Sequence, residues 1–234
     1  MKNLVLPILD AFISLFFPKL CPGCKNPLSV TEKVICFDCQ LCLPQTDHPW
    51  DHHNLLWEKL NAWLKVERAV ALFDFQKHSR VESLLYQLKY RGHEKIGAFL
   101  GDWLTPVLRQ SKVFQEVNAV LPLPLHPKRL KKRGYNQVHL FSKSLAKHLE
   151  LPLIDDLVYR KKQTQQLAKM HRHDRFKEVD EAFAIRQNSL YPPQHWLLVD
   201  DVITTGATIV SCGKTILRDC GGRLSIVSLA SRLS

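Results

Sequence analysis

Three segments near the end of the chain constrain its fold most strongly. Trp196–Val202 is an apolar run typical of a buried strand, and Thr208–Cys220 has the apolar spacing of a helix that the glycines at 221 and 222 stop. Leu224–Ala230 is a second apolar run of strand type. Two strands joined through a helix need a crossover, and crossovers give parallel pairing.

The same alternation extends upstream through most of the chain. With 234 residues, of which 45% are hydrophobic, the chain can bury a sizeable core. Further strands are predicted over Ala69–Phe75 and Ala119–Leu123 and near Leu157 and Ala182, and further helices over Ser79–Arg91, Gly97–Gln110 and Gln137–Leu149. We therefore predict an α/β protein with a mostly parallel sheet.

Two carboxylates and a Thr/Gly turn follow the strand that begins at Trp196. Ligands of parallel sheets bind beyond the carboxyl ends of the strands, where Asp200 and Asp201 are expected. The turn Thr204, Thr205, Gly206, Ala207 and Thr208 would present backbone N–H groups and hydroxyls to a phosphate at the start of a helix. The carboxylates can accept hydrogen bonds from vicinal hydroxyls or hold a divalent cation through water. A ribose 5-phosphate with free 2- and 3-hydroxyls carries both features; the alternative is a capped turn beside two solvated aspartates.

A basic segment follows the strand predicted at Ala119–Leu123. Prolines 122, 124 and 127 stiffen the exit from this strand, and His126 is followed by five Lys or Arg residues up to 133. Their charge suits a pyrophosphate. If the segment is helical, Arg129 and Arg133 lie one turn apart, so we expect these two to face the ligand, while Lys128, Lys131 and Lys132 are solvated or face another polyanion.

Four cysteines near the start of the chain have the spacing of a structural zinc site. Cys21 and Cys24 form one Cys-x-x-Cys pair, and Cys36 and Cys39 form a second. Two knuckles joined by a small hairpin would complete a tetrahedron, and four thiolates leave no position open for catalysis. Two disulfides are the alternative, which a reducing compartment disfavours.

The remaining N-terminal features concern location and domain organisation. The apolar residues 1–18 are interrupted by Pro7, Asp10 and Ser14 and predict a short packed helix rather than an anchor or a signal peptide, so we expect a cytoplasmic protein without a transmembrane segment. We expect an N-terminal helix and zinc ribbon over residues 1–45, a connecting segment over 46–65, and the α/β domain over 66–234.

These motifs together resemble the ComF (competence protein F) family, whose members combine a zinc ribbon with a type I phosphoribosyltransferase fold. The resemblance covers nearly the whole chain and rests on LLVDDVITTGAT, LPLPLHPKRLKKRGYNQ, LKYRG and the cysteine ribbon. It implies that Asp200 and Asp201 contact the ribose hydroxyls of 5-phosphoribosyl 1-pyrophosphate (PRPP), that Thr204–Thr208 hold its 5-phosphate, and that the loop after Leu121 holds its pyrophosphate. It also implies magnesium as the cofactor of PRPP and a role in natural DNA uptake alongside DNA-processing competence proteins.

One segment departs from the family pattern. Arg160, Thr164 and Arg175 fit the segment that covers the reacting centre, whereas Leu167, Met170 and Glu178 stand where the pattern has Gln, Leu and Asn. Two hypotheses therefore remain. One is a magnesium-dependent phosphoribosyltransferase with an unidentified acceptor, in which Asp200, Asp201, Arg129 and Arg133 serve the reaction. The other is a PRPP-responsive binding protein that catalyses little.

The distribution of charge predicts a further partner. The formal net charge is +11, and residues 125–178 alone contain fourteen Lys or Arg against five Asp or Glu. A pyrophosphate needs about two or three cations, so the surplus predicts an extended polyanion such as single-stranded DNA, contacted by Lys131, Lys132, Lys161 and Lys162. A solvated basic surface is the alternative. The sequence does not predict the oligomeric state.

Overall fold

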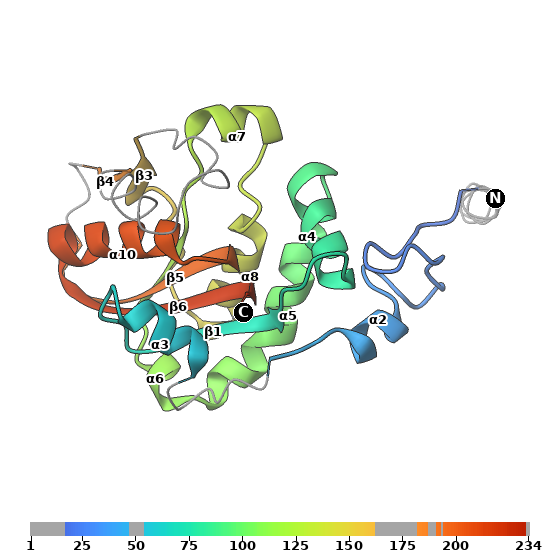
Figure 1. Cartoon of the computed structure of the whole chain (residues 1–234), viewed down its shortest axis with the longest axis horizontal. Coiled ribbons are helices and arrows are strands. Elements are labelled where there is room, and N and C mark those ends of the chain that lie inside the picture. Colours follow the sequence, from blue (N-terminus) through green and yellow to red (C-terminus); the bar gives the residue numbers. More distant parts are fainter. Residues whose placement is uncertain (1–16, 47–53, 162–181, 187–190, 193, 233–234) are drawn as a thin grey trace, which may run out of the picture.

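The computed structural model describes residues 17–46, 54–161, 182–186, 191–192 and 194–232 (Figure 1). At its centre four strands lie in the order β1-β6-β5-β2, and every neighbouring pair is parallel. Their bounds are Ala69–Asp74 for β1, Ala119–Pro122 for β2, Gln194–Ile203 for β5 and Gly222–Ser231 for β6. Two short strands, β3 (Val158–Arg160) and β4 (Phe183–Ile185), form a separate antiparallel pair. The predicted α/β class with a mostly parallel sheet is confirmed, whereas the predicted N-terminal helix lies outside the described residues.

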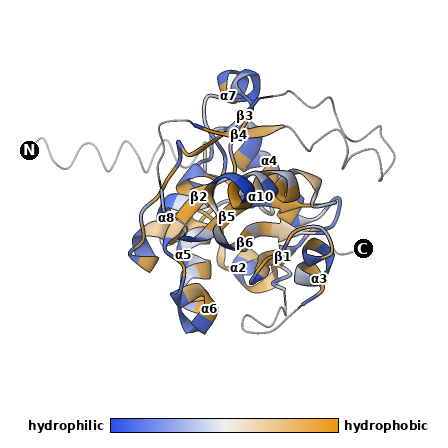
Figure 2. Ribbon diagram, turned by 90° about the vertical axis from the view of Figure 1, so that its left-hand side faces the viewer, coloured by the Kyte–Doolittle hydropathy of each residue, from blue (hydrophilic) through white to orange (hydrophobic). Residues whose placement is uncertain are grey.

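Helices cover both faces of the sheet. Because the side chains on both faces of a strand are then buried, the strands consist of continuous apolar runs. On one face Val70, Leu197 and Val227 pack with helices α4 (Arg80–Tyr90), α5 (Lys95–Gln110) and α8 (His139–Leu149). On the other face Ala71, Leu198 and Ile226 pack with α3 (Leu55–Asn61) and α10 (Ala207–Cys220). A short helix, α6 (Lys112–Gln115), follows α5. Figure 2 shows the sheet between these helices, with hydrophobic colour concentrated toward the interior.

The helix ends follow the local sequence signals. Ser79 caps α4 by accepting a hydrogen bond from the Glu82 N–H, as its capping-box spacing predicts. Helix α10 begins after Gly206, which has a left-handed backbone, and it ends at Gly221 as predicted. Helix α5 begins two residues before its predicted start.

The described part of the predicted connecting segment packs on the sheet. Helix α3 is capped by Asn54, whose Oδ1 accepts the Trp57 N–H and whose Nδ2 donates to the Ala69 carbonyl. Gln45, the residue before the predicted connecting segment, pairs antiparallel with Phe73 at the free edge of β1. The chain that leaves the cysteine ribbon is therefore tied directly to the sheet.

The helices that follow the neighbouring strands β2 and β5 lie on opposite faces of the sheet. The chain leaving β2 passes through α7 (Pro127–Arg133) to α8 on one face, whereas the chain leaving β5 enters α10 on the opposite face. The loops beyond these neighbouring strands diverge and leave a crevice at their carboxyl ends, which is where open α/β sheets bind ligands. Among the described helices, none is both long enough and apolar enough to cross a membrane.

Candidate functional site

A cavity opens at the carboxyl ends of β2 and β5. Its walls come from the end of α4, the loop after β2, helix α7 (Pro127–Arg133), and the turn that joins β5 to α10. The lining includes every residue predicted to contact the ligand: Asp200, Asp201, Arg129, Arg133 and the whole turn Thr204–Thr208. Lys128, Lys131 and Lys132 of the same helix are not among the lining residues.

The two aspartates lie in different electrostatic environments although they are adjacent. Asp200 Oδ1 accepts the N–H of Asp201 at 2.7 Å, and its side chain is buried. Burial and the neighbouring Asp201 charge raise the pKa of Asp200 to about 7. Asp201 Oδ2, by contrast, is 3.1 Å from Lys89 Nζ and accepts a 2.6 Å hydrogen bond from Gln137 Nε2. Both carboxylates line the wall of the cavity and are oxygen ligands of the type that magnesium prefers.

Gln137 also connects the aspartates to the basic helix. Its Oε1 accepts a hydrogen bond from Arg133 Nη1, while its Nε2 donates to Asp201. One amide therefore joins α7 to the end of β5. Sequence reasoning recognised Gln137 only as part of a motif, because nothing local indicates its partners.

The turn after β5 has a conformation that needs glycine. Gly206 has φ of 82°, and a Cβ placed there would lie 2.7 Å from Leu60 Cδ2 of α3. Lys59 of the same helix donates to the carbonyls of Thr204 and Arg232, which fixes one end of the turn. Helix α3 thus supports the turn, a role that its place in a predicted connector did not indicate.

Helix α7 presents the two arginines on one side. Pro127 occupies its first turn, His126 Nδ1 accepts the Lys128 N–H, and Gly134 ends it with φ of 87°. His126 therefore caps the helix, and burial and the nearby Arg160 lower its pKa. Asn136, in turn, donates to the Leu123 carbonyl and so holds the loop after β2.

Arg160 adds a third guanidinium to the wall of the cavity. It is only 6% exposed and lies over the Phe183 ring at 5.3 Å. Burial and the Arg129 charge lower its pKa, whereas the Asp200 carboxylate acts in the opposite direction. The remaining residues of the predicted covering segment, including Thr164, Leu167, Met170, Arg175 and Glu178, lie outside the described residues.

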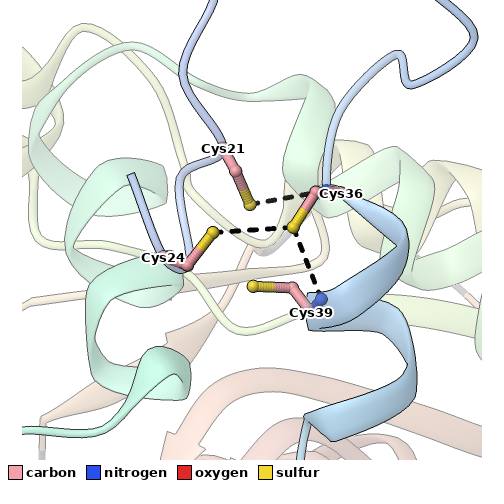
Figure 3. Close-up of side chains that lie close together, drawn as sticks. All are labelled: Cys21, Cys24, Cys36 and Cys39. Atoms are coloured by element: carbon pink, nitrogen blue, oxygen red, sulfur yellow. Dashed lines mark hydrogen bonds between the residues drawn. The ribbon is translucent and has the colours of Figure 1, made fainter. Parts of the chain in front are cut away.

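The four predicted zinc ligands converge on one point (Figure 3). Their sulfur atoms all lie within 4.8 Å of one another, and tetrahedral zinc with Zn–S bonds of about 2.3 Å separates its sulfurs by about 3.8 Å. Sulfur also accepts backbone N–H groups, from Cys36 to the Cys21 Sγ and from Cys39 to the Cys36 Sγ. The cluster can hold a metal ion and fits zinc.

The surroundings of the ribbon differ in one respect from the predicted pair of knuckles and a hairpin. The second cysteine pair opens helix α2 (Phe37–Cys42), and Cys36 is its N-cap. Gly23 leaves room for the cluster, because a Cβ there would lie 2.9 Å from Cys39 Sγ. The ribbon cysteines share one apolar cluster with α4, and Ser83 of α4 donates to the Pro22 carbonyl. The metal site and the start of the helix that carries Lys89 are therefore packed together.

No family model matches the chain. The chain is 28% identical over 216 residues to competence protein F of Haemophilus influenzae, covering 88% of this chain and 93% of that protein. It is 27% identical over 233 residues to the DNA utilization protein YhgH of Salmonella typhimurium, covering 92% and 98%. It is 28% identical over 208 residues to competence protein ComFC of Bacillus subtilis, covering 85% and 78%.

The solved structures that resemble the chain include adenine phosphoribosyltransferases. One matches with a TM-score of 0.37 and 13% identity over 74% of this chain and 88% of the other. The enzyme from Leishmania tarentolae matches with a TM-score of 0.38 and 16% identity over 80% and 94%.

Proposed function

We propose that this chain, which is a relative of the ComF proteins, binds PRPP together with magnesium in the cavity beyond β2 and β5 and takes part in natural DNA uptake. The observation that carries the proposal is the convergence of two carboxylates, a phosphate-type turn and two arginines on one cavity. The competence and DNA utilization proteins it resembles over most of its length support the role in DNA uptake.

The ribose end of PRPP is assigned to the residues that follow β5. The turn Thr204–Thr208 leads into α10, whose N-terminal N–H groups favour a phosphate. Asp201 is held by Lys89 and Gln137, so its carboxylate is oriented before a ligand arrives. Asp200 and Asp201 would accept hydrogen bonds from the 2- and 3-hydroxyls.

The pyrophosphate end is assigned to α7. Arg129 and Arg133 line the same cavity as the turn and offer planar groups that bind phosphate in pairs of hydrogen bonds. Magnesium bound with PRPP would supply further positive charge on the pyrophosphate. If transfer occurs, an acceptor atom would form a bond to the anomeric carbon as the bond from that carbon to pyrophosphate breaks through an oxocarbenium-like state, and Arg129 and Arg133 would take up the charge of the leaving group.

A second candidate function is PRPP-responsive binding without efficient transfer, in contact with single-stranded DNA and DNA-processing partners. It is favoured by Leu167, Met170 and Glu178, because these residues depart from the family pattern in the segment that would exclude water from the reacting centre. The structural zinc ribbon belongs to both candidates.

Two measurements test the proposal. Calorimetric titration with PRPP and magnesium should detect binding to the wild type and loss of affinity in the Asp200→Asn/Asp201→Asn double variant. Absence of binding to the folded wild type would overturn the proposal. Release of pyrophosphate in the presence of candidate acceptors, nucleic acid included, would then separate the transferase from the binding protein.

A further inference from the structure

A row of two tyrosines flanked by two arginines lies on the surface beside the cavity proposed to bind PRPP. Tyr86 and Tyr90 are one turn apart on α4, with ring centroids 5.2 Å apart. The Arg91 guanidinium lies 5.9 Å from the Tyr86 ring, and the Arg133 guanidinium lies 5.2 Å from the Tyr90 ring. Tyr86 and Tyr90 are nevertheless 48% and 62% exposed, so the arginines leave aromatic surface open.

A second cavity adjoins this row. It is lined by Lys89, Tyr90, Gly92, Arg129, Lys132, Arg133 and Tyr135. Four of these described residues are cationic and none is acidic. Lys89, Tyr90, Arg129 and Arg133 also line the PRPP cavity, so the two cavities share one wall.

This combination provides exposed aromatic rings, guanidinium planes and several positive charges within one region of the surface. Bases of single strands stack on aromatic rings and on arginine, and their phosphates pair with Lys and Arg. We propose that the row of Arg91, Tyr86, Tyr90 and Arg133, with the second cavity, binds single-stranded nucleic acid. Of the four lysines named by the sequence argument from charge, Lys132 lines this second cavity and Lys131 and Lys161 do not. Lys162 lies outside the described residues.

The shared wall gives the surface a consequence for regulation. Arg129 and Arg133 neutralise pyrophosphate in the PRPP cavity or phosphates of the strand, and they can serve both only if two anions are brought close together, which is unfavourable. PRPP therefore weakens binding of the strand, and the strand weakens binding of PRPP by the same factor. This second part rests on the proposed function, whereas the stacking surface does not.

The test is a fluorescence anisotropy titration of the full chain with a labelled single strand of about 15 thymidines. Tyr86→Leu should lower the affinity at least about fivefold, as expected when one base no longer stacks on a ring, without changing the dependence on salt. The matched control is Tyr159→Leu. Tyr159 is 39% exposed and lies 6.0 Å from the Arg186 guanidinium, but it lines neither cavity, so its replacement should leave the affinity unchanged.

Charge variants separate stacking from phosphate binding. The slope of log affinity against log salt is negative. Replacing Arg91 and Lys132 with glutamine should make it less steep by about 0.7 for each phosphate that the variant no longer neutralises. A strand that fails to bind the wild type, equal effects of Tyr86→Leu and Tyr159→Leu, or equal affinity for a duplex would each overturn the assignment.

The coupling is measured with the same oligonucleotide and saturating PRPP at constant free magnesium and ionic strength. We expect at least about fivefold weaker binding of the strand. Inorganic phosphate at equal concentration controls for ionic effects. If PRPP binds in calorimetry but leaves the oligonucleotide affinity unchanged, the coupling is wrong and the proposed function stands. If the strand binds through Tyr86 but PRPP does not bind, the proposed function and the coupling fail and the stacking surface stands.

Discussion

Lys89 Nζ lies 3.1 Å from Asp201 Oδ2 and so joins the last turn of α4 to the end of β5. Both side chains are largely shielded, at 23% and 8% exposure. The pair compensates one of two adjacent carboxylates in a confined space, and Lys89 also favours ionisation of Asp200. The Lys89–Asp201 pair therefore affects both the folding stability around the site and the charge of its carboxylates.

Lys89→Met should destabilise the fold by about 1–3 kcal/mol, because it leaves a shielded carboxylate without its counter-charge. The matched control is Lys147→Met, which removes an exposed lysine from the last turn of α8. Urea denaturation followed by circular dichroism measures both. Equal stabilities of the two variants would show that the pair contributes nothing.

Asp200 should make the stability of the ligand-free protein depend on pH. Its folded-state pKa of about 7 lies above the ordinary value of 3.8, so the folded state binds the proton more tightly than the unfolded state. The stabilising contribution of the protonated group is present at low pH and is lost as the pH rises through about 7. Asp200→Asn should therefore be more stable than the wild type at pH 8, by an amount that shrinks toward pH 5.5. A difference that does not change over this window would contradict the raised pKa.

The metal site should be needed for the stability of the helix that it packs against. We expect about one zinc per chain in the purified protein, because a structural site binds its metal as part of folding. Cys36→Ser/Cys39→Ser should lose the metal and lower the melting temperature. Cys42→Ser is the control, since Cys42 is exposed and lies outside the four-sulfur cluster. Zinc-free wild-type protein from zinc-replete medium, with free thiols, would exclude the site.

The fold and the site differ in how far local sequence could predict them. The strands and α4 were predictable because buried parallel strands are apolar throughout and because Ser79 and Glu82 form a local cap. Helix α3 was missed because its support is non-local, with Asn54 bonded to Ala69 and Lys59 bonded to Arg232.

The same distinction applies to the cavity. The residues from Asp200 to Thr208 form one continuous segment, so a single local motif was enough to predict them as parts of one site. The partners that orient Asp201 come from α4 and from the segment between α7 and α8, and only the folded chain brings them near it. The convergence of the predicted residues on one cavity is observed, whereas their roles toward a ligand stay predictions.

The two arginines of α7 should bind PRPP in a way that their neighbours do not. Arg129→Gln/Arg133→Gln removes two charges from the cavity wall, whereas Lys128→Gln/Lys131→Gln removes two charges from the same helix outside the lining. Because both variants change the net charge equally, any long-range attraction of an anionic ligand falls by a similar amount. Wild-type protein at a PRPP concentration of about 100 times its Kd should gain about 2.7 kcal/mol of stability. The lysine variant should keep most of this gain and the arginine variant should lose it, as measured by thermal unfolding with PRPP and magnesium. Equal loss in both variants would mean that PRPP senses only the overall charge of α7, and the assignment of the pyrophosphate to Arg129 and Arg133 would be wrong.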